Sequence, residues 1–245
     1  MNILLKIPFI KNLYERLNDF YERRNWVIKQ LNTLQKNSIL LDAGCGDQQY
    51  REFCKHLIYK GQDFGQYKSD EKKGMASESI FNLKNSNYKD YNYGNLDYVG
   101  DIWNIKEKDE TFDAILCTEV FEHIPYPIET VKEFYRLLKP NGVLLLTTPS
   151  NSLRHQDPYY FYPGFSDRWF EKILSDSHFS IETITPVGDY YSWLAVEMAR
   201  TSLKNSIFSK IILLPAFLYF ICKKKNELSI NTLCNGYHVR AKKVV

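Results

Sequence analysis

The stretch that decides the fold is Ser38-Ile-Leu-Leu-Asp-Ala-Gly-Cys-Gly46. Its apolar run is short and unbroken, as in a parallel strand that is covered on both faces. Gly44 and Gly46 allow the chain to turn sharply after the strand and to approach a ligand closely. In an open α/β sheet, ligands bind beyond the carboxyl ends of the strands, beside the first one. The stretch predicts a strand that ends in a ligand-binding turn, with a plain strand-to-helix turn as the alternative.

Outward from this turn, apolar runs alternate with helical patterns. We expect further strands at residues 58–63, 96–101, 112–117, 143–148, 179–187 and 236–242. We expect helices at residues 9–35, 48–57, 128–138, 169–177 and 190–222, the last one broken at Pro215. The polar stretch 64–95 shows little periodicity and is expected to form a loop. The alternation predicts an α/β fold with a doubly wound, Rossmann-like and mostly parallel sheet.

Length and composition indicate one α/β domain with additions. The 245 residues are 44% hydrophobic and 25% charged, which is ordinary globular composition and excludes wholesale disorder. We expect an N-terminal helical segment at 1–36, a core at 37–190, and a C-terminal helical addition with a final strand at 191–245. The five cysteines include no CxxC pair, which argues against a disulfide framework or a zinc cluster and favours a reducing compartment. We expect no bound metal.

The basic residues cluster near the C-terminus. Six of them and no acidic residue lie between Arg200 and Lys225, so the rest of a chain with a net charge of +3 carries −3. A nucleic-acid-binding protein usually spreads its basic residues over the main surface, so we expect no nucleic-acid partner. The apolar run Ile211–Cys222 is too short to span a bilayer. Residues 204–225 are expected either to lie on a membrane surface or to pack on the core or in a dimer contact.

No signal peptide is recognisable, so the expected location is cytoplasmic, at the inner membrane face if residues 204–225 touch lipid. The sequence gives no prediction of the oligomeric state.

An acidic residue stands at the end of each of four predicted strands. Asp63 follows Gly44 by 19 positions and could accept hydrogen bonds from a ribose diol. Asp101 could accept from an adenine amino group, and Glu119 follows the next strand. Asp42 precedes the glycine turn, where its charge favours a cationic ligand over a pyrophosphate. S-adenosylmethionine (SAM) carries an ammonium, a sulfonium, a ribose and an adenine, and it matches this set of acids.

Five motifs in order resemble class I SAM-dependent methyltransferases of the type 11 kind. They are Leu41-Asp-Ala-Gly-Cys-Gly46, Gly61-Gln-Asp63, Gly100-Asp-Ile102, Phe112-Asp-Ala-Ile-Leu-Cys-Thr-Glu-Val-Phe-Glu-His-Ile124 and Leu137-Leu-Lys-Pro-Asn-Gly-Val-Leu-Leu-Leu-Thr-Thr-Pro149. The resemblance covers about residues 38–150. It implies a seven-stranded sheet whose last strand is antiparallel. It also implies SAM as the cofactor.

The resemblance also assigns roles to single residues. Asp42 and the turn Gly44-Cys45-Gly46 would line the methionine end of SAM, and Asp63 would bind the ribose. Asp101 and Ile102 would bind the adenine, and Thr118 and Glu119 would lie at the sulfonium. The family often has a third glycine where this chain has Gln48, which we expect to narrow the mouth of the pocket.

Two histidines are candidates for a general base at a hydroxyl or amine acceptor. His155 lies in a polar and aromatic loop after the fifth strand, and His123 follows the fourth. The alternatives are an exposed loop residue for His155 and a packing residue for His123.

The expected reaction is methyl transfer to oxygen or nitrogen of a small or lipid-linked acceptor. The segments Gly46-Asp-Gln-Gln-Tyr50 and His155-Gln-Asp-Pro-Tyr159 are also similar to bacterial surface-polysaccharide methyltransferases, which suggests a sugar. The alternatives are a quinone or other lipid acceptor, or a SAM-binding protein without transfer activity. A dehydrogenase is disfavoured because Gln49 replaces the third glycine of GxGxxG.

Overall fold

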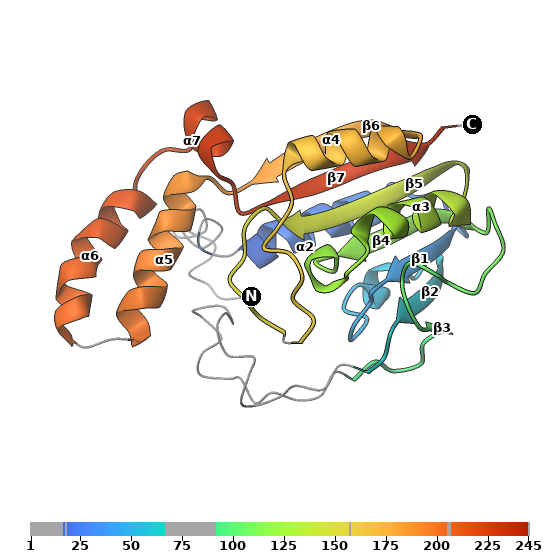
Figure 1. The fold of residues 1–245 in the computed structure, drawn as a ribbon, viewed down its shortest axis with the longest axis horizontal. Helices are drawn as coiled ribbons and strands as arrows, with labels where there is room; N and C mark the ends of the chain where they lie inside the picture. The colour runs from blue at the N-terminus through green and yellow to red at the C-terminus, as the bar shows by residue number, and fades with distance from the viewer. Residues whose placement is uncertain (1–16, 18, 67–91, 157, 205–206, 245) are drawn as a thin grey trace.

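The chain forms one mixed sheet flanked by helices (Figure 1). The computed structural model describes residues 17, 19–66, 92–156, 158–204 and 207–244. The strands are β1 (Ile39–Ala43), β2 (Ile58–Asp63), β3 (Tyr98–Val99), β4 (Phe112–Thr118), β5 (Leu138–Pro149), β6 (Phe179–Val187) and β7 (Gly236–Lys243). The helices are α2 (Asp19–Leu31), α3 (Pro127–Leu137), α4 (Asp167–Asp176), α5 (Tyr190–Lys204), α6 (Ile207–Ile221) and α7 (Glu227–Thr232).

The strand order, β3-β2-β1-β4-β5-β7-β6, confirms the predicted sheet. Strands β3 to β5 pair in parallel, whereas β7 is antiparallel to both neighbours. In the centre, Leu41 of β1 lies opposite Lys60 of β2 and Ile115 of β4. Because β1 separates β2 from β4, the chain winds outward in both directions from it. The glycine turn after β1 is therefore at the switch point, where α/β sheets bind ligands.

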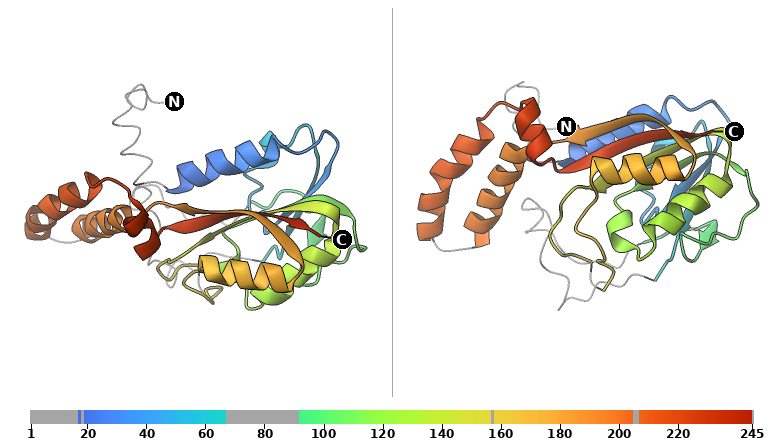
Figure 2. Two further views of the ribbon diagram at one scale, coloured as in Figure 1. Left: turned by 90° about the horizontal axis from the view of Figure 1, so that it is seen from above. Right: turned by 45° about the horizontal axis from the view of Figure 1, so that its top comes forward.

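Two apolar layers hold the helices against the two faces of the sheet. Alternate residues of one strand point to opposite faces, so Leu144 and Leu146 of β5 belong to one layer and Val143 and Leu145 to the other. The first layer packs against α3 and α4, and the second against α2, as Figure 2 shows. Large buried side chains fill both layers, which explains why the central strands read as unbroken apolar runs.

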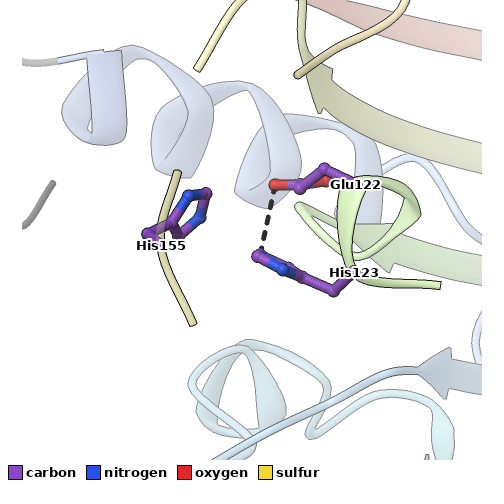
Figure 3. A group of neighbouring side chains, drawn as sticks. All are labelled: Glu122, His123 and His155. Carbon is purple, nitrogen blue, oxygen red and sulfur yellow. Dashed lines mark ion pairs between the residues drawn. The ribbon is translucent and has the colours of Figure 1, made fainter. Parts of the chain in front are cut away.

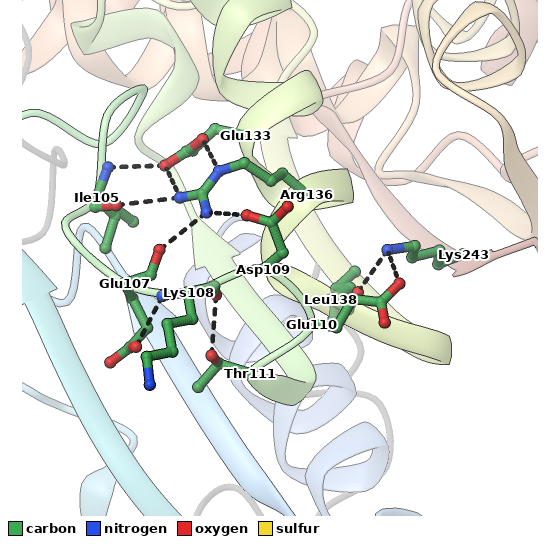
Figure 4. Close-up of polar contacts among 10 residues, drawn as sticks. All are labelled: Ile105, Glu107, Lys108, Asp109, Glu110, Thr111, Glu133, Arg136, Leu138 and Lys243. Carbon is green, nitrogen blue, oxygen red and sulfur yellow. Dashed lines mark hydrogen bonds and ion pairs between the residues drawn. The ribbon is translucent and has the colours of Figure 1, made fainter.

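A polar cluster ties the segment before β4 to helix α3 (Figure 4). The Arg136 guanidinium donates to both carboxylate oxygens of Glu133, at 2.7 and 2.9 Å, and to the carbonyl oxygens of Ile105 and Glu107. Glu133 also accepts the backbone N–H of Ile105, at 2.8 Å. These bonds hold residues 105–107 against α3. They therefore help to position Asp101 and Ile102, which lie between β3 and this segment.

Several expected boundaries were wrong. The helix expected at 48–57 is only a short 3₁₀ turn, Arg51–Phe53, and Gln48, where the helix was expected to begin, has a left-handed conformation (φ +58°) that does not belong to an α-helix. The strand expected at 96–101 is limited to Tyr98–Val99. Residues 190–222 form two helices, and Pro215 lies inside α6 instead of ending a helix.

Other expectations were confirmed or lie beyond the described residues. The helices expected at 128–138 and 169–177 are present as α3 and α4. The start of the helix expected at 9–35 and most of the loop expected at 64–95 fall outside the described residues. The described part of the chain contains no helix long and apolar enough to cross a membrane. Helices α5 and α6 form a hairpin that extends from one end of the sheet (Figures 1 and 2).

Candidate functional site

The glycine turn after β1 requires its first glycine. Gly44 has φ +72°, and a Cβ atom there would lie 2.5 Å from Cγ2 of Val120. The Gly44 N–H donates to the backbone and side-chain oxygens of Gln62, at 2.9 and 3.1 Å. The Gln62 amide in turn donates to the Gly100 carbonyl, at 2.7 Å. Gln62, which the sequence did not single out, therefore joins the ends of β1, β2 and β3.

Asp63, at the end of β2, holds the turn from the other side. Its Oδ2 accepts the Gly46 N–H at 2.9 Å, and its Oδ1 accepts the Gly65 N–H at 3.1 Å. Burial raises the pKa of the Asp63 carboxyl, although these backbone N–H groups oppose the shift. A carboxylate has about four acceptor positions, so two bonds leave capacity for a ligand hydroxyl. Asp63 lines the cavity described below, as the ribose assignment requires.

Asp42 does not reach that cavity, although it was expected to line it. The carboxylate is 1% exposed and accepts a hydrogen bond of 2.7 Å from the hydroxyl of Tyr59. Burial raises the pKa of Asp42 to about 7, and the Tyr59 hydroxyl opposes this rise. Asp42 lies on the strand before the turn, where its side chain faces the interior of the protein. Its charge can act on a ligand only at a distance.

The first cavity lies at the carboxyl ends of β1, β2 and β4 and has a volume of about 350 Å³. It is lined by the other predicted cofactor residues, Gly44, Cys45, Gly46, Asp63, Asp101, Ile102, Thr118 and Glu119. It also has aromatic walls from three loops. The sequence indicated only the loop of Tyr159 and Phe161, and it did not single out Phe64 or Trp103. Residues that are far apart in sequence and lie in irregular segments give no periodic signal.

Gln48 does not narrow the mouth of this cavity. Its amide nitrogen donates to the carbonyls of Tyr93 and Asn95, at 2.6 and 3.0 Å, and its oxygen accepts from Arg51. The neighbouring Gln49 contributes to the wall instead. The positive φ of Gln48 explains why a glycine would be favourable at this position.

A second cavity, of about 290 Å³, shares Arg23 and Glu119 with the first. The Arg23 guanidinium, from α2, lies 3.0 Å from the Glu119 carboxylate, whose other oxygen accepts from Thr147. Trp193 and three further residues of α5 line the second cavity, together with His155 and Glu122. The C-terminal hairpin therefore contributes to this cavity.

The two candidate histidines lie side by side, with ring centroids 4.6 Å apart. His123 borders the first cavity and His155 the second. Burial lowers the pKa of His123 to about 4 and also lowers that of His155, so both imidazoles are neutral at pH 7. Beside them, burial and then the neighbouring Glu119 raise the pKa of Glu122 well above its usual range.

The first cavity fits SAM. Its described lining residues include four acids (Asp47, Asp63, Asp101 and Glu119) and one permanently charged cation, Arg23, which suits a cationic ligand. Asp63 would hold the ribose, the apolar Ile102 with the nearby Trp103 would hold the adenine, and the glycine turn would approach the methionine end. SAM supplies a methyl group that its sulfonium sulfur already activates for transfer.

The comparisons with known proteins agree with this geometry. A family model described as "Methyltransferase domain" matches residues 12–187. A demethylmenaquinone methyltransferase from Geobacillus sp. is 26% identical over 78% of this chain and 80% of its own length. A ubiquinone biosynthesis O-methyltransferase from Coxiella burnetii is 31% identical over 129 residues, which are 52% of this chain and 50% of that protein.

Solved structures show the same fold. A geranyl diphosphate methyltransferase in complex with SAM superposes with a TM-score of 0.53 at 12% identity, covering 91% of this chain and 85% of that one. The match over 12–187 covers more than half of the chain and includes the glycine turn and the strand-end acids. The chain therefore belongs to the methyltransferase domain family and is a class I SAM-dependent methyltransferase.

Proposed function

We propose that this enzyme methylates a hydroxyl oxygen of a small ring acceptor that binds in the second cavity. The observation that carries the proposal is that the second cavity adjoins the cofactor cavity at Arg23 and Glu119 and contains a neutral histidine. A hydroxyl oxygen is a poor nucleophile until it loses its proton, and a nearby group that promotes this loss accelerates transfer.

The reaction needs no covalent enzyme intermediate. The acceptor hydroxyl releases its proton as its oxygen bonds to the methyl carbon. The carbon–sulfur bond breaks at the same time, and the sulfonium becomes a neutral thioether. The protein holds the two reactants in line and excludes water. His155 and His123 lie where the acceptor proton must leave, which is the role we propose for them.

A quinol is the acceptor class that the comparisons favour. Two relatives are named for demethylmenaquinone and for ubiquinone biosynthesis. The second cavity includes the Trp193 indole, on which a flat ring can pack, and the Arg200 and Glu197 side chains at its wall. A sugar of a surface polysaccharide is the second candidate, because the loop that carries His155 is polar and aromatic.

The test is methyl transfer from radiolabelled SAM to three acceptors: a water-soluble catechol, a demethylated quinol and a free sugar. We expect labelled product with the catechol or the quinol hydroxyl. His155→Ala should lower turnover by about 10²–10⁴ without changing SAM affinity, as expected for loss of acid–base catalysis. His178→Ala, at an exposed position, is the matched control. Label on the sugar alone would contradict the quinol as acceptor and support the second candidate, and label on quinol carbon alone would refute the proposed hydroxyl methylation.

We further propose that helix α6 rests on an anionic lipid surface. Its large side chains are exposed, with Ile207 72%, Phe208 68% and Ile211 64% accessible. Lys223–Lys225 follow directly, and the ammonium of Lys223 lies over the Tyr219 ring at 4.5 Å. Apolar side chains beside lysines suit the interface of a bilayer, where each basic residue contributes about 1 kcal/mol. This placement would bring the second cavity, which α5 borders, close to a lipid-soluble acceptor.

Flotation with vesicles of phosphatidylcholine and phosphatidylserine tests the contact. We expect binding that weakens with salt and that is lost when Lys223, Lys224 and Lys225 become Gln. A matched control replaces Lys106, Lys108 and Lys132, which lie away from the hairpin. Failure to float at low salt, or a stable dimer by light scattering that the substitution Ile211→Ser dissociates, would overturn the lipid contact.

A further inference from the structure

Three metal-ligating side chains converge between the two cavities. Glu122 and His123 come from the 3₁₀ turn Phe121–His123 after β4, and His155 comes from the loop after β5 (Figure 3). One potential ligand atom of each lies within 4.8 Å of the others. This cluster was not apparent from the sequence, which led us to expect no bound metal, because 32 positions separate His123 from His155 and no CxxC or HxxxH spacing is present.

Hydrogen bonds fix the orientation of both imidazoles. Nδ1 of His123 lies 2.6 Å from the carbonyl oxygen of Tyr159, and Nδ1 of His155 lies 2.8 Å from that of Leu153. A carbonyl oxygen can only accept, so Nδ1 carries the hydrogen in each ring and Nε2 of each neutral ring keeps a lone pair. Histidines that bind metals usually donate their other ring N–H to a carbonyl or carboxylate in this way.

One carboxyl oxygen of Glu122 is buried without a donor in the described part of the chain. The residue is 2% exposed, and its Oε2 has no hydrogen-bond partner among the residues that the structure describes. Its Oε1 lies 3.6 Å from Nε2 of His123. That distance is too long for a hydrogen bond, so these two atoms are not hydrogen-bonded to each other in this arrangement. A buried carboxylate oxygen without a donor is unfavourable unless a proton or a metal cation neutralises the group.

We propose that Glu122, His123 and His155 bind one divalent first-row metal ion, such as Zn²⁺. Two imidazoles and a carboxylate are a common ligand set for this ion. In a tetrahedral site with bonds of about 2.1 Å, ligand atoms lie about 3.4 Å apart. The pair in the 3₁₀ turn is already at 3.6 Å, and His155, on a loop, needs to approach by at most about 1.4 Å.

Three protein ligands leave at least one coordination position for the acceptor. His123 borders the cofactor cavity, whereas Glu122 and His155 border the second cavity. A hydroxyl that binds the ion loses its proton more easily, because the positive charge stabilises the alkoxide or phenolate. With the ion bound, the Nε2 atoms of both histidines would be ligands, so the ion would replace their proposed acid–base role and the acceptor proton would pass to water. This role rests on the proposed function, but binding of the ion does not. Glu119 is held by Arg23 and Thr147 and is not needed as a ligand.

Calorimetric titration of the chelator-treated full chain with Zn²⁺ alone, and separately with Mn²⁺ alone, tests the site. We expect about one ion per chain, and at least about tenfold weaker binding in His155→Ala and in Glu122→Gln. His178→Ala and Cys222→Ser, which remove an exposed imidazole and an exposed thiol, should bind as the parent does. Titration of each variant with SAM shows that it is folded.

Unchanged binding in His155→Ala, or no binding of either ion by folded parent protein, would overturn the site. The methyl-transfer assay with and without chelator separates this result from the proposed function. Hydroxyl methylation that survives the chelator, in a chain that binds no ion, contradicts the metal site alone. A chain that binds the ion but methylates no hydroxyl contradicts the proposed function alone.

Discussion

Replacement of Asp63 by alanine should weaken SAM binding, and the hydrogen bonds of this carboxylate set the size of the effect. Its two oxygens already accept the N–H groups of Gly46 and Gly65, so the variant loses both bonds to the turn as well as those to the ribose. Each hydrogen bond to a charged group contributes about 1.5–3 kcal/mol. Because part of this loss falls on stability, we expect about 1–3 kcal/mol in SAM affinity, or about 5–150-fold.

Asp63→Asn is the informative companion variant, since it keeps one acceptor oxygen for the turn but loses the charge. Calorimetry with SAM measures the affinity of both variants, and urea unfolding measures their stability. We expect Asp63→Ala to lose stability and affinity, and Asp63→Asn to retain more of its stability than of its affinity. Unchanged SAM affinity in a folded Asp63→Ala protein would refute the ribose assignment.

Two further predictions concern the glycine turn and the buried histidines. Gly44→Ala should lower the stability of the protein more than Gly65→Ala does. The two glycines have similar φ angles (+72° and +69°), but only at Gly44 would a Cβ atom clash with Val120. Urea unfolding should therefore show an additional loss of about 1–3 kcal/mol from overpacking in Gly44→Ala, and equal losses would contradict this. Burial lowers the pKa of His238, which lies beside Trp26, to about 3. Between pH 6.5 and 3 the unfolded chain therefore binds a proton at this residue and the folded chain does not, so stability falls on acidification through this window. The substitution His238→Gln should remove a few kcal/mol of this pH dependence. An identical pH dependence of unfolding in the parent and in His238→Gln would contradict the second prediction.

The sequence predicted the sheet because the signals of its strands are local. Unbroken apolar runs such as Val143–Leu146 reflect burial on both faces, and the glycine turn needs backbone angles that few other residues adopt. Six of the seven strands lie close to their predicted positions. The third strand was predicted too long. Because β3 has only two paired residues, its sequence is too short to show the alternation of a strand.

The site could be predicted only in part, for a physical reason. Asp63, Asp101 and Glu119 follow strands whose carboxyl ends meet at one edge, so the topology brings them together. Asp42 was misplaced because alternation along β1 turns its side chain to the interior, toward Tyr59. Arg23 was missed because its contact with Glu119 depends on how α2 packs, and the sequence pattern of a helix does not specify its partner.

The central claim is that the first cavity binds SAM, and calorimetric titration of the full chain with SAM and with NAD tests it most directly. The strand-end acids and the glycine turn predict one SAM per chain, weakened by Asp63→Ala, and no measurable binding of NAD, whose pyrophosphate would meet an acidic wall. Binding of NAD without binding of SAM would contradict the account.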